Sequence, residues 1–263
     1  TQGVSSAASD VYKRQLLTTK KVFFDGVVRE LLWFIKGQTN SKILEKNKVN
    51  IWKCNSSQEF LENNFLPYKE GICGPIYGFQ WRKFGEKYPY ITNNKLHYTD
   101  GIEQGFDQLG YILHEIKKNP TSRRLFMSGW NPNQIHQMCL PPCHVSYQFY
   151  VDNGKLSCQM YQRSADVFLG LPFNIASTAL LVHLMAKMLD FGVGMVHICI
   201  GDAHIYEDHL GVVEEQLRRE GSLYELPEVE VLRKVDKIEH YEFEDIVLKN
   251  YKSHPMIKAK MFA

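Results

Sequence analysis

One hairpin constrains the fold of this chain more than any other segment. Two runs rich in aromatic and β-branched residues, 143–151 and 156–164, lie on either side of Asn153-Gly154. Asn-Gly between such runs predicts a two-residue β-turn, which fixes the register of the strands. If no bulge interrupts the ladder, counting outward from the turn gives the pairs Asp152–Lys155, Cys143–Ser164 and His144–Arg163. A thiol and a guanidinium are therefore expected to be neighbours.

Cys143 is the candidate nucleophile that this register predicts. A fixed positive charge lowers the pKa of a cysteine, and the thiolate is the reactive form. Pro141 and Pro142 cannot extend a central strand, so the thiol is expected at the mouth of the sheet. The alternative is that Cys143 is one more small buried apolar residue. The neighbouring Arg163 favours the nucleophile.

The composition is that of one globular domain. A chain of 263 residues with 44% hydrophobic residues can bury one sizeable core, and no run of about 18 uninterrupted apolar residues occurs. The six cysteines form no C-x-x-C pair, so reduced thiols and a cytoplasmic location are expected. The net charge of +2 is evenly spread, which argues against bulk nucleic-acid binding. Residues 1–14 lack apolar periodicity and are treated as an unrelated or disordered tail; 15–263 are expected to form one mixed α/β domain.

Glu30 is a second candidate for chemistry. Apolar spacing predicts a helix from Asp25 that ends at Gly37, and Glu30 lies inside its apolar face, between Val27 and Phe34. Burial there raises the pKa of the carboxyl group. The alternative is an internal ion pair with an arginine.

The remaining patterns predict the other elements. Helices are expected at 40–46, 56–61, 106–118, 174–190 and 207–219, and strands at 125–127, 196–201, 229–235 and 246–248. Asn174 is expected as a helix N-cap. Residues 74–81 are interpreted as an aromatic, glycine-rich turn that either packs the core or forms a wall for a flat ring, and 88–101 as a polar surface insertion.

Several polar residues have two interpretations. Arg123-Arg124 is either a solvated edge or a guanidinium pair that grips a phosphate. His204 and Tyr206 share one face of a strand, so their polar tips can converge on one small group. No metal is expected, because the sets Cys139, Cys143, His144 and His204, His209 match no common metal-site spacing.

Four runs together resemble the thymidylate synthase family. They are Leu140-Pro141-Pro142-Cys143-His144, Tyr161-Gln162-Arg163-Ser164-Ala165-Asp166, Leu171-Pro172-Phe173-Asn174-Ile175-Ala176-Ser177 and Gly201-Asp202-Ala203-His204-Ile205-Tyr206. Supporting matches extend from Leu16-Leu17-Thr18-Thr19-Lys20 to the end of the chain. The resemblance implies an α/β (α+β) fold, a single mixed-sheet domain flanked by helices, which dimerises through a sheet face.

The resemblance also implies a reaction. dUMP would be reductively methylated to dTMP with 5,10-methylenetetrahydrofolate as co-substrate, releasing dihydrofolate. Cys143 would attack C6 of the uracil ring, which needs a group that can also leave. Asn174 would bind the O4 and N3 edge; a carboxylate there would suit cytosine, as in the related hydroxymethylases. The other implied catalytic residues are Glu30, Tyr77, His144, Arg163 and Asp166.

The resemblance assigns binding roles to further residues. Contacts to dUMP are implied for Arg123, Arg124, Gln162, Arg163, Ser164, Ala165, Asp166, Asn174, His204 and Tyr206, with the first two donated by the second subunit of a homodimer. Contacts to folate are implied for Ile51, Trp52, Asp166, Leu169, Gly170, Phe173 and Ala263.

The resemblance fails at the beginning of the chain. Family members have a helix, strands and a further phosphate-binding arginine before the match at Leu16, and residues 1–14 match none of these. The resemblance therefore also leaves open an upstream dihydrofolate reductase domain in the full gene product, as in the fused relatives. The alternatives for function are a pyrimidine nucleotide hydroxymethylase, a non-catalytic truncated subunit that binds nucleotide, folate or RNA, and a generic cysteine hydrolase, although no His and Asn order suggests a triad.

Overall fold

A mixed five-stranded sheet forms the centre of the protein, in a computed structural model that describes residues 6–10, 16–219 and 224–261. The strand order is β1-β7-β6-β5-β4. The strands are β1 (Ser6–Asp10), β4 (Phe126–Ser128), β5 (His144–Asp152), β6 (Lys155–Asp166) and β7 (Gly192–His204). Neighbours are antiparallel except β6 and β7. Helix α6 (Gly170–Leu189) makes the crossover that a parallel pair requires.

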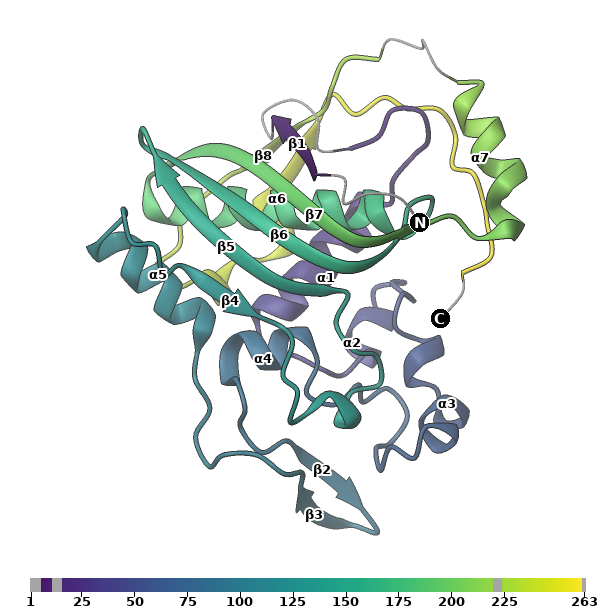
Figure 1. Cartoon of the computed structure of the whole chain (residues 1–263), viewed down its shortest axis with the longest axis vertical. Coiled ribbons are helices and arrows are strands. Elements are labelled where there is room, and N and C mark those ends of the chain that lie inside the picture. Colours follow the sequence, from purple (N-terminus) through teal and green to yellow (C-terminus); the bar gives the residue numbers. More distant parts are fainter. Residues whose placement is uncertain (1–5, 11–15, 220–223, 262–263) are drawn as a thin grey trace.

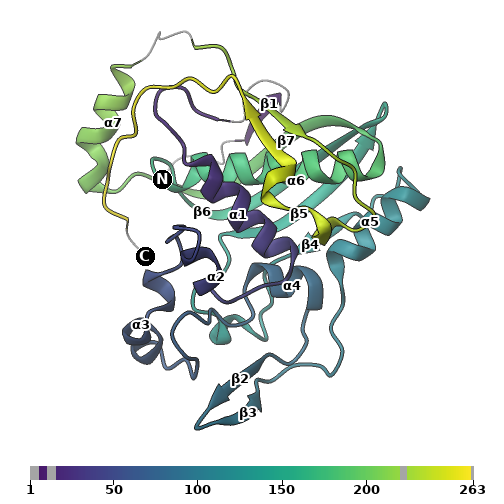
Figure 2. The same cartoon turned by 180° about the vertical axis from the view of Figure 1, so that it is seen from behind.

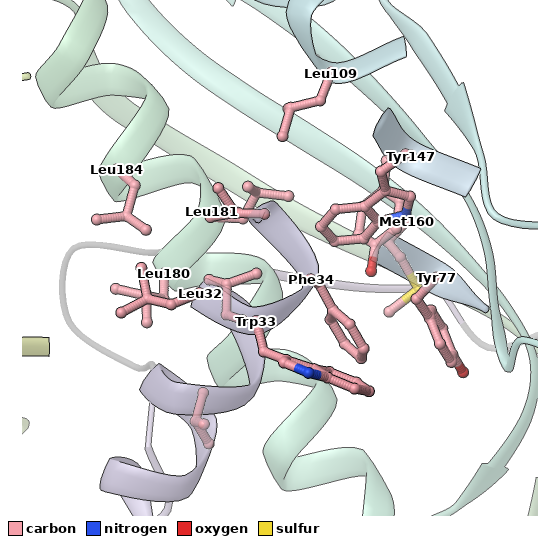
Figure 3. Close-up of a cluster of buried hydrophobic side chains, with 14 of the residues drawn as sticks. Leu32, Trp33, Phe34, Tyr77, Leu109, Tyr147, Met160, Leu180, Leu181 and Leu184 are labelled. Atoms are coloured by element: carbon pink, nitrogen blue, oxygen red, sulfur yellow. The ribbon is translucent and has the colours of Figure 1, made fainter. Parts of the chain in front are cut away.

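Helices cover one face of this sheet (Figures 1 and 2). Helix α6 lies against β6 and β7, with α1 (Phe24–Ile35) packed on α6. Figure 3 shows Leu32 and Phe34 of α1 and Leu181 of α6 as members of one cluster of buried side chains. Of the described helices, α6 alone is long and apolar enough to cross a membrane. Most of its side chains are buried in the core, which accounts for its apolar composition.

The opposite face of the sheet carries large exposed side chains. Phe126, Tyr150, Tyr161 and Met195 are 51%, 58%, 43% and 42% exposed, whereas the alternate residues Tyr147 and Met160 are buried. Side chains alternate between the two faces of a strand, so the sheet has one apolar core face and one face on which these large side chains alternate with polar ones such as Gln148 and Gln159.

The remaining elements surround the sheet. They are α2 (Lys42–Glu45), α3 (Gln58–Asn63), α4 (Tyr77–Lys83), α5 (Gln108–Lys118), α7 (Leu210–Leu217), the hairpin β2 (Pro89–Thr92) and β3 (Lys95–Tyr98), the pair β8 (Glu228–Val231) and β9 (Ile246–Lys249), and 3-10 turns at Cys54–Ser56, Ile135–Gln137, Glu207–His209, Ile238–His240 and Phe243–Asp245. The mixed α/β fold expected from the sequence is therefore confirmed. Within the segment 1–14, Ser6–Asp10 form β1 against β7, and the boundary at residue 15 stays a prediction.

The central hairpin has the predicted turn and a different register further out. Asn153 and Gly154 both have positive φ, at 48° and 71°, as the predicted turn requires, and Asp152 pairs with Lys155. A bulge between His144 and Ser146 then places His144 opposite Gln162. The predicted pairs at positions 143 and 144 were therefore wrong by one residue, because the prediction allowed for no bulge.

Two helix predictions also need correction. Asn174 is not an N-cap, because α6 begins four residues earlier, at Gly170. Pro172 in the first turn is compatible with a helix, since the amide groups there have no intrahelical partner. Residues 77–83 form helix α4, where a turn was expected. Gly78 allows this helix to approach α1, since a Cβ on it would lie 2.5 Å from the Phe34 carbonyl oxygen.

Candidate active site

The bulge places Cys143 beside Arg163. The Arg163 amide donates to the Cys143 carbonyl oxygen at 2.9 Å, and Nη2 of Arg163 lies 3.9 Å from Cys143 Sγ. Nε and Nη2 of the same guanidinium donate to the carbonyl oxygens of Pro142 and Pro141, each at 3.0 Å. The guanidinium is thus fixed by main-chain acceptors. The predicted neighbourhood of thiol and guanidinium is confirmed, although the exact pairing was wrong.

The electrostatics of Cys143 differ from the prediction. Burial raises the pKa of the thiol, and the Arg163 charge and a contact with Tyr77 only partly oppose that effect. The expected net lowering was wrong, because the sequence showed the nearby charge and not the loss of water around the sulfur. Arg163 is therefore best described as limiting the penalty of forming a buried thiolate.

Tyr77 and His144 complete the surroundings of Cys143. The Cys143 amide donates to Tyr77 Oη at 2.7 Å, which fixes the main chain at the thiol. The Tyr77 ring stacks on Phe34 with centroids 4.9 Å apart (Figure 3) and meets the His144 ring edge-on at 5.6 Å. Burial lowers the pKa of His144 to about 4, so its ring is neutral near pH 7. Its Nδ1 hydrogen-bonds Tyr147 Oη at 3.0 Å.

Glu30 is half-buried on the inward side of α1, as its helical position predicts. Burial raises the pKa of this carboxyl group to about 7, and a hydrogen bond from Trp52 opposes the rise. Trp52 Nε1 donates to Glu30 Oε1 at 2.7 Å. Among the described residues no arginine forms an ion pair with Glu30, so the alternative of an internal ion pair is not supported. The indole was expected only as an apolar wall, and its donor role was missed.

Asn174 is oriented by a neighbouring amide. Gln162, which is almost fully buried on β6, donates from Nε2 to Asn174 Oδ1 at 2.8 Å and to the Ser164 carbonyl oxygen at 2.9 Å. Gly170 keeps this region open, since a Cβ on it would lie 3.7 Å from Asp166 Cβ and 3.8 Å from Asn174 Oδ1. The two ends of the Asn174 amide are thus held in a defined direction.

Asp166 organises the loop that leads into α6. Its Oδ1 accepts from the amides of Phe168 at 3.0 Å and Leu169 at 3.1 Å. Lys20 donates to the Phe168 carbonyl oxygen and lies 3.4 Å from the centroid of the Phe168 ring. Burial lowers the pKa of Lys20 to about 8, partly opposed by Asp166. Lys20 was missed as a site residue, and only its buried environment singles it out.

An open hollow of about 630 Å³ adjoins Arg163. Its lining consists of Arg163, Ser164, Asp202, His204, Ile205, Tyr206 and Glu207. The rings of His204 and Tyr206 meet edge-on at 5.1 Å, as their shared face predicts. Asp202 Oδ1 lies 2.8 Å from His204 Nδ1. Asp202 orients the imidazole and was missed, although its spacing of two residues along a strand could have indicated it.

Arg123 and Arg124 lie apart from this site within one chain. Both are exposed and precede β4, in which Phe126 pairs with Gln148 of β5. Arg124 is therefore next to the part of β5 near Tyr150, about 20 Å along the strand from Cys143 at about 3.3 Å per residue.

The other expected site residues differ in burial. Trp52 and Ala165 are buried, Ile51, Leu169 and Phe173 are half-buried, and Ala263 lies outside the described residues. Within the described ranges no group of three or more metal-ligating side chains comes together.

The site and fold together define a class of protein, a mixed α/β protein with a cysteine held beside a fixed arginine and with a carboxyl group whose pKa is raised by burial. The chain belongs to the thymidylate synthase family, since the family model described as "Thymidylate synthase" matches residues 6–263.

Relatives of two kinds share this domain. Human thymidylate synthase is 47% identical over 247 residues, which cover 94% of this chain and 76% of the relative. Thymidylate synthase of Ascaris suum is 47% identical over 249 residues, covering 94% and 81%. A putative bifunctional dihydrofolate reductase-thymidylate synthase of Oryza sativa subsp. japonica is 46% identical over 248 residues, covering 94% and 48%. The chain thus spans about half the length of that bifunctional relative.

Proposed function

We propose that this chain methylates dUMP to dTMP with 5,10-methylenetetrahydrofolate, through covalent attack of Cys143 on C6 of the uracil ring. The observation that carries the proposal is the position of Cys143 Sγ, 3.9 Å from a guanidinium that two carbonyl oxygens hold in place. A nucleophile with a fixed partner of this kind suits covalent catalysis. The membership of the family supplies the identity of the substrate.

The residues around the thiol have complementary roles. As Cys143 adds to C6, the thiol proton leaves and negative charge develops toward O4 of the ring. The Asn174 amide, directed by Gln162, hydrogen-bonds the O4 and N3 edge and stabilises that charge. Tyr77 holds the main chain of the nucleophile. The thiol is also a good leaving group, so the same residue releases the product.

Glu30 is the proposed proton-transfer residue. With a pKa of about 7, the carboxyl group is about half protonated at neutral pH, so it can both accept and donate a proton there. The hydrogen bond from Trp52 fixes one of its two oxygens. His144, neutral near pH 7, lines the ring site without adding charge.

The folate co-substrate would lie between Trp52, Ile51 and Phe173. The half-buried Ile51 and Phe173 offer apolar surface beside the buried Trp52, and Gly170 leaves space beside Asp166, whose carboxylate suits the donor groups of a pterin. When bound, the folate supplies both the one-carbon unit and the hydride that reduces it. Residues of this chain exclude water and orient the ring, which strengthens each polar contact in the site.

The phosphate of dUMP would be bound at a subunit boundary. Arg163 and Ser164 border the open hollow, and the partner subunit's Arg123 and the partner subunit's Arg124 would complete it in a homodimer. The exposed face formed by Phe126, Tyr150, Tyr161 and Met195 is the proposed dimer interface. Tyr150→Asp is expected to convert the dimer to monomer in sedimentation velocity, and an unchanged dimer would contradict this interface.

A covalent adduct tests the reaction. With 5-fluoro-dUMP and the folate, the fluorine at C5 cannot leave as a proton does, so the protein is expected to gain the mass of both molecules on Cys143. An unmodified Cys143 would contradict the proposal. Product analysis with dUMP and labelled folate tests the hydroxymethylase alternative, because that enzyme would yield a hydroxymethyl product in place of dTMP.

Two broader features are also part of the proposal. We place the protein in the cytoplasm, which fractionation with an antibody would test. The bifunctional relatives support a dihydrofolate reductase domain in the full gene product, and the size of the endogenous protein on an immunoblot would test that.

A further inference from the structure

Cys73 and Cys139 form a buried thiol pair that the proposed reaction does not use. Their side chains are 0% and 5% exposed, and both cysteines are free. The Cys139 amide donates to the Cys73 carbonyl oxygen at 3.0 Å, and the Cys73 side chain is the largest influence on the pKa of Cys139, so the two thiols are neighbours. Cys73 Sγ in turn lies 3.9 Å from the Gly71 carbonyl oxygen. Two thiols with this arrangement are positioned to react with each other.

The backbone around the pair is close enough for a disulfide. A direct main-chain hydrogen bond between two residues places their Cα atoms roughly within the range of about 4.4 to 6.8 Å that a disulfide spans. Gly74 has φ +74°, and a Cβ on it would lie 2.2 Å from the Gln137 carbonyl oxygen. Tyr68 Oη donates to the same oxygen at 2.8 Å. The two segments are therefore held against each other, and little movement is needed to bring the sulfur atoms together.

The same two segments lead to the nucleophile. Tyr77 follows Cys73 by four residues, and Cys143 follows Cys139 by four residues. The Cys143 amide donates to Tyr77 Oη at 2.7 Å. The thiol pair thus lies at one end of two adjoining segments, and the contact that fixes the nucleophile lies at the other. A change in separation at the pair is transmitted to Cys143 over four residues of chain on each side.

We propose that Cys73 and Cys139 form a reversible disulfide when the protein is exposed to a peroxide, and that this bond slows turnover by displacing Tyr77 relative to Cys143. One thiol first attacks the peroxide O–O bond, giving a sulfenic acid and releasing water or an alcohol. The second thiol then displaces the sulfenic oxygen as water. The pair loses two electrons and two protons, and the peroxide takes up both. A displacement of about 1 Å at a catalytic group can reduce a rate about 100-fold.

The environment of the pair sets the conditions of this reaction. The hydrogen bond with Cys73, together with burial, raises the pKa of Cys139 well above its usual range. Thiolate is therefore scarce at neutral pH, and oxidation is expected to be slow and to accelerate as pH rises. The pair would respond to sustained exposure to peroxide.

Peptide mapping tests the bond itself. In a Cys143→Ser background, hydrogen peroxide treatment, alkylation under denaturing conditions and digestion are expected to yield a linked 73–139 peptide and an intact mass lower by 2 Da. Dithiothreitol should remove the link. Cys73→Ala and Cys139→Ala should each abolish it, so the result does not depend on one variant folding. Cys158→Ala is the matched control, since Cys158 is also buried and has a raised pKa. Absence of the linked peptide overturns the proposal.

Activity tests the consequence, and only this part depends on the proposed function. After peroxide treatment, kcat per remaining Cys143 thiol is expected to fall at least fivefold in the wild type and to recover with dithiothreitol. In Cys73→Ala, peroxide treatment should lower total activity only in proportion to the fraction of Cys143 thiol that is oxidised, so kcat per remaining Cys143 thiol should stay unchanged. An equal reversible loss of kcat per remaining Cys143 thiol in Cys73→Ala would overturn the regulatory effect. A failure of the proposed function would instead appear as no turnover in untreated protein, with the linked peptide still formed.

Discussion

The two ends of the candidate site are built in different ways. Around the proposed position of the pyrimidine ring, Tyr77 and His144 are buried and Glu30 is half-buried, and their pKa values are shifted. Around the proposed position of the phosphate, Arg163 and His204 border an open hollow, while Arg123 and Arg124 are exposed at the far end of β5. In the proposed dimer, one chain supplies all the residues of the ring end, whereas the second subunit adds positive charge to the phosphate end.

The difference follows from what each end has to do. Burial favours the neutral form of every titratable group, so it raises the pKa of Glu30 and lowers that of His144. A single core provides that effect. Three guanidinium groups gathered in one core would instead require desolvation of like charges, which is costly. Charges on the surface of two subunits can meet at a boundary while each stays solvated before assembly. The following predictions test this contrast, from the largest effect to the smallest.

Cys143→Ser should remove nearly all activity. Loss of a catalytic nucleophile typically reduces kcat by at least about 10⁴-fold. Turnover should be measured with a coupled or radiolabel assay, and the fluorinated adduct should be absent by mass spectrometry. Cys54→Ser, at an exposed cysteine, is the control and should leave kcat unchanged. Residual turnover above 1% of the wild type would contradict the assigned nucleophile.

Glu30→Gln should be the next most damaging change. Removal of a general acid and base lowers kcat by about 10²- to 10⁴-fold. The limb of the pH profile near the Glu30 pKa of about 7 should also disappear, because glutamine does not titrate. Glu59→Gln on the exposed surface of α3 should retain that limb. If the limb persisted in Glu30→Gln, another group would have to be responsible for it.

The same variant should change stability in a pH-dependent way. Burial raises the pKa of Glu30 from 4.5 to about 7, so the folded state binds its proton more tightly than the unfolded chain. That stabilisation is present below pH 4.5 and is lost as pH rises toward 7, at about 1.4 kcal/mol per pH unit. Relative to the wild type, Glu30→Gln should gain on the order of 3 kcal/mol between pH 4.5 and pH 8. Denaturant titration at both pH values would measure this difference. The comparison isolates Glu30, because the lowered pKa values of His144 and His183 contribute equally to both proteins.

Replacement of Arg123 and Arg124 by Ala tests the phosphate end. Each charged hydrogen bond contributes about 1.5 to 3 kcal/mol, so KM for dUMP should rise at least tenfold. Equal amounts of this double variant and of Cys143→Ser should then be mixed and reassembled. Half of the resulting dimers contain one subunit of each kind, and each mixed dimer has one intact site out of two. The mixture should therefore recover about a quarter of the wild-type activity. No recovery in confirmed mixed dimers would mean that each chain uses its own arginines, and the contrast between the two ends would fail.

His204→Ala should have the smallest effect. One neutral hydrogen bond contributes about 1 kcal/mol, so KM for dUMP should rise about fivefold with little change in kcat. Asp202→Asn should produce part of the same rise, because Asp202 orients the imidazole. His114→Ala, at an exposed position of α5, is the control. A large fall in kcat would instead place His204 at the ring end.

The parts of the site that follow from local sequence were predicted correctly. The Asn153-Gly154 turn set the beginning of the register, and helical spacing directed Glu30 inward. The predictions of register and of contacts failed where a β-bulge inserts one extra residue into a strand or where segments distant in sequence come into contact. Nothing local signals the bulge between His144 and Ser146, or the beginning of α6 at Gly170. The donor on Trp52 that reaches Glu30 lies 22 residues away.

The amino-acid sequence by itself determined the class of fold, the proximity of Cys143 and Arg163, and the position of Glu30 on an apolar helix face. These properties depend on side-chain period and turn chemistry, which act over a few residues. Only the tertiary structure decided the direction of the pKa shift of Cys143, the hydrogen bond between Trp52 and Glu30, and the meeting of Cys73 with Cys139. Desolvation and contacts between distant segments arise only when the whole core has formed, so no local pattern contains them.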